Sequence, residues 1–252
     1  MTDPLFLLPA QRLGGDTVVL SGREGHHAAD VRRLRPGERV DVGDGAGTRL
    51  RCRVVAAARS EVRLEVVSRC SEPPGAPRVE VALALIKQDA AERALATMTE
   101  VGVDAVLPWA ARRSVVTWDG ERVQRGVRRW RSTVAEAAKQ SRRAWVPEVM
   151  TPVGTDELVR RVGLVDLALL LDVDAEHCLA DVPVGAASIL LVVGPEGGPT
   201  EDESAALVGA GARPVHLGPT VLRSATAATV AAAVLLSRTP RWTSRPQEAP
   251  AG

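Results

Sequence analysis

The feature that most constrains the fold is a series of short apolar segments that alternate with helical segments in the C-terminal part of the chain. The apolar segments are residues 79–86, 104–109, 165–172, 188–193 and 213–218. Each is followed by a loop and then mostly by a helical pattern. Apolar strands that alternate with helices are typical of a parallel sheet covered on both faces. This part of the chain therefore predicts an α/β fold with a mostly parallel sheet.

The N-terminal part has a different pattern. The segment "RVDVGDGAGTRLRCRVVAAARSEVRLEVV" alternates apolar and polar residues, and Asp44-Gly45 lies in a loop that suits a hairpin turn. Short regular strands of this kind predict a small β-barrel. The segment "CSEPPGAPR" that follows is rich in proline and is the best linker candidate. We predict domains at residues 1–72 and 73–238, and a disordered tail at residues 239–252.

The composition predicts a cytoplasmic protein without metal. No apolar run is long enough to span a membrane, and the N-terminus lacks the basic region of a signal peptide. The three cysteines, Cys52, Cys70 and Cys178, are scattered without the spacing of a zinc site or a disulfide framework.

Charge is unevenly placed along the chain. Residues 108–145 hold ten Lys and Arg against three Asp and Glu, whereas residues 146–210 hold two against twelve. This separation indicates one surface for a polyanion and another that avoids it, although solvated helix faces explain any single cluster about as well.

The segment "LLVVGPEGGPTEDE" (190–203) reads as strand, glycine loop and helix, the arrangement of many nucleotide sites. Thr200 and Glu203 can form a capping box, which would occupy the amides that a phosphate needs. The loop also fails the G-x-G-x-x-G pattern and has no adjacent basic residue. It is better suited to a neutral or cationic ligand, and a tight turn without a ligand is the alternative.

Two further segments hold candidate functional residues. In "HLGPTVLRSATAATVAAAVLL" (216–236), Arg223 precedes a helix start, where a cation is electrostatically misplaced. A surface salt bridge is the alternative explanation. In "WRSTVAEAAKQSRRAWVPE" (130–148), Glu136 and Gln140 share one helix face. An ordinary amphipathic helix would show the same pattern.

Together these segments resemble the ribosomal small-subunit methyltransferase E family, whose members methylate N3 of a uridine in 16S rRNA. The matches are "LLVVGPEGG", "LGPTVLRSATAA" and "RWRSTVAEAAKQSRRAWVPE", and "REGHHAADVRRLRPGERVDVGDGAG" is similar to the family's N-terminal domain. The resemblance covers nearly the whole chain apart from the tail. It implies an N-terminal PUA-like β-barrel that helps to hold RNA and a C-terminal SPOUT α/β domain with a deep trefoil knot. It also implies a homodimer with the active site at the subunit interface.

The resemblance implies S-adenosyl-L-methionine as the cofactor and 16S rRNA or the small ribosomal subunit as the partner. The residues that match the cofactor loops are Leu171, Gly194, Pro195, Glu196, Gly197, Leu217, Gly218, Val221 and Leu222. The candidates for RNA binding are Arg23, Arg32, Arg33, Arg35, Arg112, Arg113, Gln140 and Arg143. The candidate catalytic residues are Arg223 and Glu136.

Methyl transfer from a sulfonium is a one-step displacement in which the protein aligns nucleophile and donor. Uridine N3 must lose a proton, and the charge then spreads to O2 and O4 of the base. Arg223 is expected to stabilise that charge or to fix the base or its phosphate. Glu136 and Glu196 are candidate proton acceptors, and solvent is an alternative. Whether Glu196 contacts the ribose, contacts the methionine amine or transfers a proton stays open.

Several positions depart from the family pattern. They are Gln88 and Ala90 in "KQDA", Thr97, Arg112 in "ARRS" and Ala225 in "RSAT". Ala225 replaces a glutamate that could act as a base, so a non-catalytic RNA-binding relative is one alternative. A SPOUT enzyme with another RNA target is a second. A dinucleotide oxidoreductase is a third, although no G-x-G-x-x-G turn follows an early strand.

Overall fold

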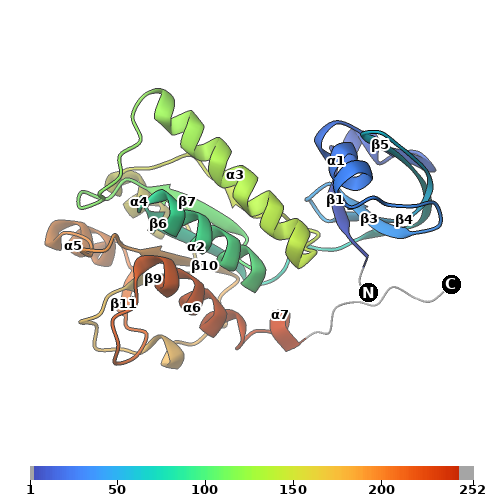
Figure 1. Ribbon diagram of the computed structural model, residues 1–252. Coiled ribbons are helices and arrows are strands. Elements are labelled where there is room, and N and C mark those ends of the chain that lie inside the picture. The colour runs from blue at the N-terminus through green and yellow to red at the C-terminus, as the bar shows by residue number, and fades with distance from the viewer. Residues whose placement is uncertain (1–2, 244–252) are drawn as a thin grey trace. The chain divides into compact units, whose positions relative to one another are not determined.

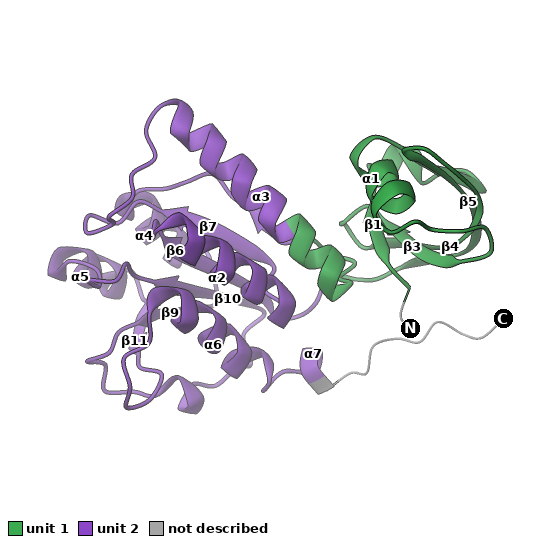
Figure 2. Cartoon of the chain, in the orientation of Figure 1, with its two compact units in different colours: residues 1–74, 135–146 green, residues 75–134, 147–252 purple. Residues whose placement is uncertain are grey.

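In the computed structural model, which describes residues 3–243, the chain forms two compact units (Figures 1 and 2). Unit 1 comprises residues 1–74 and 135–146, and unit 2 comprises residues 75–134 and 147–252. The sequence had predicted a single boundary near residue 72. It did not indicate that residues 135–146 belong with the N-terminal unit.

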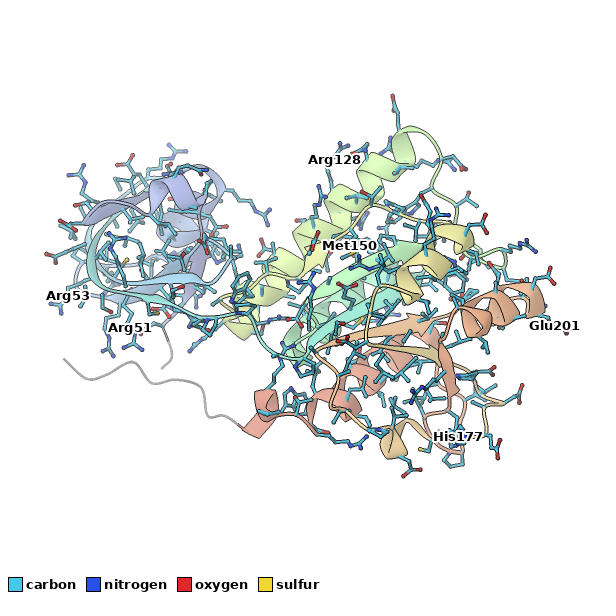
Figure 3. The ribbon with its side chains drawn as sticks, turned by 180° about the vertical axis from the view of Figure 1, so that it is seen from behind. Arg51, Arg53, Arg128, Met150, His177 and Glu201 are labelled. Carbon is cyan, nitrogen blue, oxygen red and sulfur yellow. The ribbon has the colours of Figure 1, made fainter. Side chains whose placement is uncertain are left out.

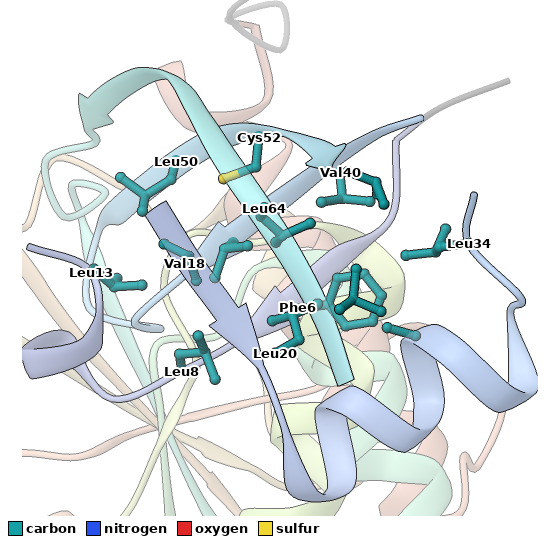
Figure 4. Close-up of a cluster of buried hydrophobic side chains, with 14 residues drawn as sticks. Phe6, Leu8, Leu13, Val18, Leu20, Leu34, Val40, Leu50, Cys52 and Leu64 are labelled. Carbon is teal, nitrogen blue, oxygen red and sulfur yellow. The ribbon is translucent and has the colours of Figure 1, made fainter. Parts of the chain in front are cut away.

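Unit 1 is built on a sheet with the strand order β1-β3-β4-β5-β2. Its strands are β1 (Leu5–Leu7), β2 (Thr17–Leu20), β3 (Arg39–Gly43), β4 (Thr48–Ala58) and β5 (Glu61–Ser71). Alternate strand residues such as Phe6, Leu20, Leu50 and Leu64 point inward and form one buried cluster (Figure 4). The predicted hairpin turn joins β3 to β4, where Asp44 Oδ1 accepts hydrogen bonds from the amides of two residues further along the turn.

Residues 135–146 are held in unit 1 by specific contacts. They include the end of α3 (Glu121–Ser141) and the turn behind it. Trp145 Nε1 donates to the carbonyl of Glu72 at 2.9 Å, and its ring lies where a Cβ on Gly47 would be, 2.7 Å away. Lys139 Nζ lies 2.9 Å from Glu24. A tryptophan and a largely buried ion pair therefore fix this segment, although it lies far along the chain from the strands it contacts.

Unit 2 contains a sheet with the order β11-β9-β10-β6-β7-β8, in which every pair of strands is parallel. The strands are β6 (Arg78–Ala84), β7 (Ala105–Trp109), β8 (Glu148–Val149), β9 (Leu167–Leu171), β10 (Ser188–Val193) and β11 (Arg213–Val215). The other helices are α2 (Gln88–Val101), α4 (Thr155–Val162), α5 (Glu201–Gly209), α6 (Ser224–Leu236) and α7 (Pro240–Thr243). The predicted parallel α/β fold is confirmed. The trefoil knot stays a prediction.

Helices cover both faces of this sheet. On one face, Leu158 of α4 and Leu207 of α5 join a buried cluster with strand residues such as Leu190. The other face is covered by α2 and α6, which pack against each other (Figure 1). Because both faces are buried, the strands are apolar throughout, which explains why their sequence pattern was readable.

The long helix α3 runs unbroken through Gly126. A Cβ on Gly126 would lie 2.5 Å from Trp118, whose ring also meets Trp130 edge to face at 5.2 Å. Glycine is thus explained by the close approach of an aromatic ring and not by an interruption of the helix. Among the helices of the described chain, none is both long enough and apolar enough to cross a membrane.

The beginning of the predicted disordered tail is ordered. Arg241 in α7 donates to the carboxylate of Asp104 at 2.6 Å and to the carbonyl of Gly102 at 2.7 Å. Trp242 Nε1 donates to the carbonyl of Val101. These contacts attach α7 to the end of α2, so the tail does not begin at residue 239. Residues 244–252, the rest of the predicted tail, lie outside the described residues.

Candidate active site

The strand register brings three loops of unit 2 to one edge of the sheet. Val215 of β11 pairs with Leu171 of β9, and Leu170 of β9 pairs with Val192 of β10. All three strands are parallel, so the segments that follow them start side by side. In open α/β sheets this edge, at the carboxyl ends of the strands, is where ligands bind.

The first loop is the glycine segment after β10. The amide of Gly198 donates to the carbonyl of Pro195 at 2.9 Å, and Gly198 has a φ of +68°, which closes a tight turn. A Cβ on Gly194 would lie 2.7 Å from Pro199, so only glycine lets the chain fold back on itself here. Glu196 at the tip is exposed, and within the described residues its carboxylate forms no hydrogen bond or ion pair.

The predicted capping box behind this loop is confirmed. Thr200 Oγ1 accepts from the amide of Glu203 at 3.3 Å, and the Glu203 carboxylate accepts from the amide of Thr200 at 2.9 Å. Glu203 is only 1% exposed and also accepts from the amide of Arg112 at 2.9 Å and from Thr155 Oγ1 at 2.7 Å. Burial raises the pKa of Glu203, but the amide and hydroxyl donors together outweigh it and hold the pKa below its usual 4.5.

The segment "ARRS" (111–114) after β7 forms hydrogen bonds to the glycine loop. Arg113 Nη1 donates to the carbonyls of Gly197 and Pro199, both at 3.1 Å. Arg112 Nη1 lies 3.1 Å from Asp202 in an exposed pair. The predicted role of both arginines in RNA binding stays a prediction. In this structure the Arg113 guanidinium holds the loop and the Arg112 guanidinium forms only an exposed pair in the first turn of α5, and no local sequence signal indicated contacts across more than 80 residues.

The second loop, residues 217–222, follows β11. Gly218 has a φ of +114°, and its amide donates to His216 Nδ1 at 3.0 Å. That bond requires an unprotonated Nδ1, which fixes the tautomer of His216. Leu217 and Leu222 are half-buried, whereas Val221 is 80% exposed. The loop therefore presents two half-buried leucine side chains and exposed backbone groups at the carboxyl ends of the strands.

Arg223 ends this loop as the N-cap residue of α6. Its side chain is exposed and makes no capping bond, and within residues 3–243 it has no hydrogen-bond or ion-pair partner. The first amides of α6 therefore lack the carboxylate that caps α5. A free guanidinium and a helix N-terminus together create positive potential, which favours a negative charge at this place.

The edge of the sheet fits S-adenosyl-L-methionine. The N-terminus of α5 is already capped, and Arg113 is committed to loop carbonyls, so the glycine loop has no free cation for a phosphate. A cofactor without phosphate, but with a flat base, hydroxyls and an amine, suits apolar Leu171, Leu217 and Leu222 beside open backbone. In the described part of the chain no cluster of three or more His, Cys, Asp or Glu could hold a metal.

The remaining candidate residues lie in unit 1. The Glu136 carboxylate accepts from Arg23 and lies 2.9 Å from Lys139, so two cations engage it. Gln140 and Arg143 lie in the segment 135–146. The side chains of Arg32, Arg33 and Arg35 are exposed after the π-helical turn η2 (His27–Val31). Burial, with a contribution from Asp41, raises the pKa of the Cys52 thiol to about 12.

Comparison with known proteins gives the family. A family model described as an RNA methyltransferase domain matches residues 73–236, and one described as an RNA methyltransferase PUA domain matches residues 20–67. The chain is 48% identical over 247 residues to ribosomal RNA small subunit methyltransferase E of Mycobacterium tuberculosis, covering 96% of this chain and 94% of that protein. The chain belongs to the ribosomal RNA small subunit methyltransferase E family.

Other members of the small subunit methyltransferase E family agree. The Bacillus subtilis member is 30% identical over 221 residues, covering 84% of this chain and 86% of the relative. The solved structure of the Neisseria gonorrhoeae member bound to S-adenosyl methionine has a TM-score of 0.83 and 27% identity, with coverage of 94% and 98%. A protein from Legionella pneumophila solved with the same cofactor has a TM-score of 0.86, 27% identity and equal coverage. This family's cofactor and its RNA methyltransferase class agree with the site described above.

Sequence reasoning missed several residues that shape this site. Thr155 binds the buried Glu203, and His216 holds Gly218. The hydroxyl of Thr97, a position expected to depart from the family pattern, lies 2.6 Å from the hydroxyl of Thr229 and so links α2 to α6. The residues in the first and third of these contacts are far apart in sequence. Only His216, two residues before Gly218, gave a local signal for its contact.

Proposed function

We propose that this protein transfers a methyl group from S-adenosyl-L-methionine to N3 of a uridine in 16S ribosomal RNA, acting in the cytoplasm as a homodimer. One observation carries the proposal. The parallel register starts the glycine loop and the second loop side by side, and Arg223 ends the second loop, in a chain that belongs to the ribosomal RNA small subunit methyltransferase E family.

The two loops hold the cofactor by backbone and by leucine side chains. Gly194–Gly198 and Leu217–Leu222 supply amides and carbonyls, and Leu171 supplies an apolar surface next to them. When bound, S-adenosyl-L-methionine supplies the methyl group from its sulfonium. The protein's contribution is to keep both loops rigid, through Arg113 on one and His216 on the other.

Arg223 and the N-terminus of α6 stabilise the charge of the reacting base. Loss of the N3 proton leaves negative charge on O2 and O4 of uracil, and a guanidinium with free amides behind it meets that charge with preorganised donors. The absence of any partner for the Arg223 side chain within the described residues supports this role, since a structural arginine would have one.

For the proton, Glu196 is the better supported of the two candidate carboxylates. It is exposed on the glycine loop, without an intramolecular partner in the described chain, and it belongs to the same unit as Arg223. The ion pairs of Glu136 with Arg23 and Lys139 support a structural role for that residue in unit 1. Release of the proton to solvent is the alternative.

The function is tested by deleting the gene and mapping 16S rRNA modifications by mass spectrometry. We expect one N3-methyluridine to be lost and to be restored by purified protein with S-adenosyl-L-methionine. A deletion strain that keeps all its methylated uridines contradicts the proposed substrate, and loss of a methyl group elsewhere would identify another RNA target. In parallel, S-adenosylhomocysteine should bind the protein and NAD should not.

A further inference from the structure

The first part of α3 carries an arginine surface that the active site does not use. Residues 121–134, which belong to unit 2, contain five arginines and one acid, Glu121. With 3.6 residues per turn, four of the arginines lie on the side of the helix away from the buried residues Val127, Trp130 and Val134. The fifth, Arg131, lies at the border of the buried side. All five are exposed, and Figure 3 labels one of them, Arg128, on the outer side of α3. They are Arg122, Arg125, Arg128, Arg129 and Arg131.

Two of these arginines are used within the protein and three are not. Arg129 pairs with Glu92 of α2, and Arg131 Nη2 donates to the carbonyl of Val149 at 3.3 Å. The guanidinium groups of Arg122, Arg125 and Arg128 form no hydrogen bond or ion pair with any residue of the described chain. We call these three residues the α3 arginine row. Spaced three residues apart, they lie along one side of the helix over about 9 Å.

The α3 arginine row destabilises the helix electrostatically unless a ligand binds to it. Like charges three residues apart on a helix repel each other, and Arg122 lies in the first turn, where the helix dipole disfavours a cation. An ordinary solvated helix face would intersperse acids with these arginines, as α4 does with Asp156 and Glu157 before Arg160 and Arg161. Between 121 and 134 the only acid, Glu121, is in no ion pair that the described structure contains.

We propose that the α3 arginine row is a second RNA-binding surface, which holds phosphates of the ribosomal RNA away from the methylated base. The inference rests on the proposed RNA substrate. Arginine forks match phosphate oxygens in geometry, and a row of them follows a backbone that carries one phosphate per nucleotide. Such contacts give affinity without reading the sequence, and that affinity falls with salt.

The test compares two full-length double variants that each remove two exposed charges. In Arg125→Gln/Arg128→Gln, glutamine keeps the helix propensity. The matched control is Arg160→Gln/Arg213→Gln, whose arginines are exposed in unit 2 outside the row and are unpaired within the described residues. Binding of in vitro transcribed 16S rRNA is measured against KCl, together with S-adenosylhomocysteine affinity and circular dichroism.

We expect the α3 variant to bind the RNA roughly 10- to 30-fold more weakly near 0.1 M salt, with the slope of log K against log salt reduced by about 1.5, as counterion release predicts for two lost phosphate contacts. Its affinity for S-adenosylhomocysteine should not change. Arg125→Lys/Arg128→Lys should recover most of the RNA affinity, since a lysine also neutralises a phosphate. The control should stay within about twofold of wild type, because distant solvated charges are screened.

Equal losses in both double variants would show a general charge effect and overturn the inference, as would an unchanged RNA affinity in the α3 variant. Polyglutamate serves as a probe for an acidic protein partner. If the α3 variant loses binding to polyglutamate but keeps full RNA affinity, the row binds an acidic protein and the inference is overturned. If wild-type protein binds the RNA through the row but methylates no uridine, the proposed function fails and the inference stands. If wild type methylates 16S rRNA and the α3 variant binds this RNA as well as wild type does, the inference fails and the proposed function stands.

Discussion

Two residues near the starts of helices α5 and α6 show how a charged side chain can be assigned to structure or to chemistry. Glu203 lies buried in the first turn of α5, with amide and hydroxyl donors from Thr200, Thr155 and Arg112 around its carboxylate. Arg223 begins α6 exposed, with no partner among the described residues. A fully satisfied charge stabilises the fold, whereas an unsatisfied one is available to a substrate.

Arg223→Ala should abolish most of the methylation and leave the fold intact. Loss of one preorganised donor to a developing anion costs about 10²- to 10³-fold in rate. The measurement is single-turnover methyl transfer to 16S rRNA under saturating cofactor, with thermal unfolding as the check on folding. Arg223→Lys, which keeps the positive charge but not the forked guanidinium donors, should retain part of the rate. Methylation by Arg223→Ala at a rate near wild type would exclude this role.

Glu203→Gln should destabilise the protein in a pH-dependent way. The folded-state pKa of Glu203 is lowered, so its contribution to stability is present above the ordinary value near 4.5 and is lost as the pH falls through the folded-state pKa. At neutral pH we expect a loss of roughly 1–3 kcal/mol in the free energy of unfolding, the range for hydrogen bonds to a buried charge.

Urea unfolding of both proteins across the acidic range measures this effect. The difference between wild type and Glu203→Gln should shrink below pH 4.5. A difference that stays constant down to strongly acidic pH would mean that the Glu203 charge is not what stabilises α5.

Among the elements, the turn after β7 has the most consequences for the site. It carries Arg113 to the carbonyls of Gly197 and Pro199 and the Arg112 amide to Glu203, so one short segment holds both the glycine loop and the start of α5. The cofactor loop is therefore shaped by a part of the chain that need not contact the cofactor.

Arg113→Ala should weaken cofactor binding more than RNA binding. Removing two hydrogen bonds from a partly solvated guanidinium frees the loop, and we expect the dissociation constant of S-adenosylhomocysteine to rise by roughly fivefold to 20-fold. Calorimetry measures it, with Arg112→Ala as the control because its exposed pair with Asp202 contributes little. The opposite pattern, unchanged cofactor affinity with weaker RNA binding, would restore the RNA role predicted from the sequence.

The elements that the sequence predicted well are those with a local signal. β10 was predicted with its observed bounds because five apolar residues follow Ser188 and end at a glycine turn. The end of α2 also has a local signal, because Gly102 follows it as a C-cap with a φ of +115°. The capping box of α5 is likewise contained within four residues.

The features that were missed depend on partners far along the chain. Nothing in the sequence shows that Trp118 packs against Gly126, which is the reason for a glycine inside α3. Arg241 looked like part of a disordered tail because its partner, Asp104, is 137 residues away. Arg113 looked like a phosphate ligand for the same reason. An arginine has the same sequence signal whether it binds RNA or a carbonyl of its own chain.

At the scale of the whole molecule, the chain is expected to act as a pair. Two copies would have twice the mass of the 26.6 kDa chain. Light scattering on a gel-filtered sample at micromolar concentration measures that mass directly. A mass of one chain together with full methyltransferase activity would show that a single copy forms a complete site, against the homodimer we propose.

The position of β11 in the sheet has a consequence for the time at which the enzyme becomes active. β11 is the last strand in the chain and lies at an edge of the sheet, next to β9. Leu217, Gly218 and Arg223 all follow it. During synthesis the N-terminal parts fold first, so a nascent chain can complete its glycine loop and the α5 cap while the other half of the pocket is still inside the ribosome. In the mechanism that we propose, methyl transfer can therefore begin only when the final strand has docked and the residues behind it have left the ribosome.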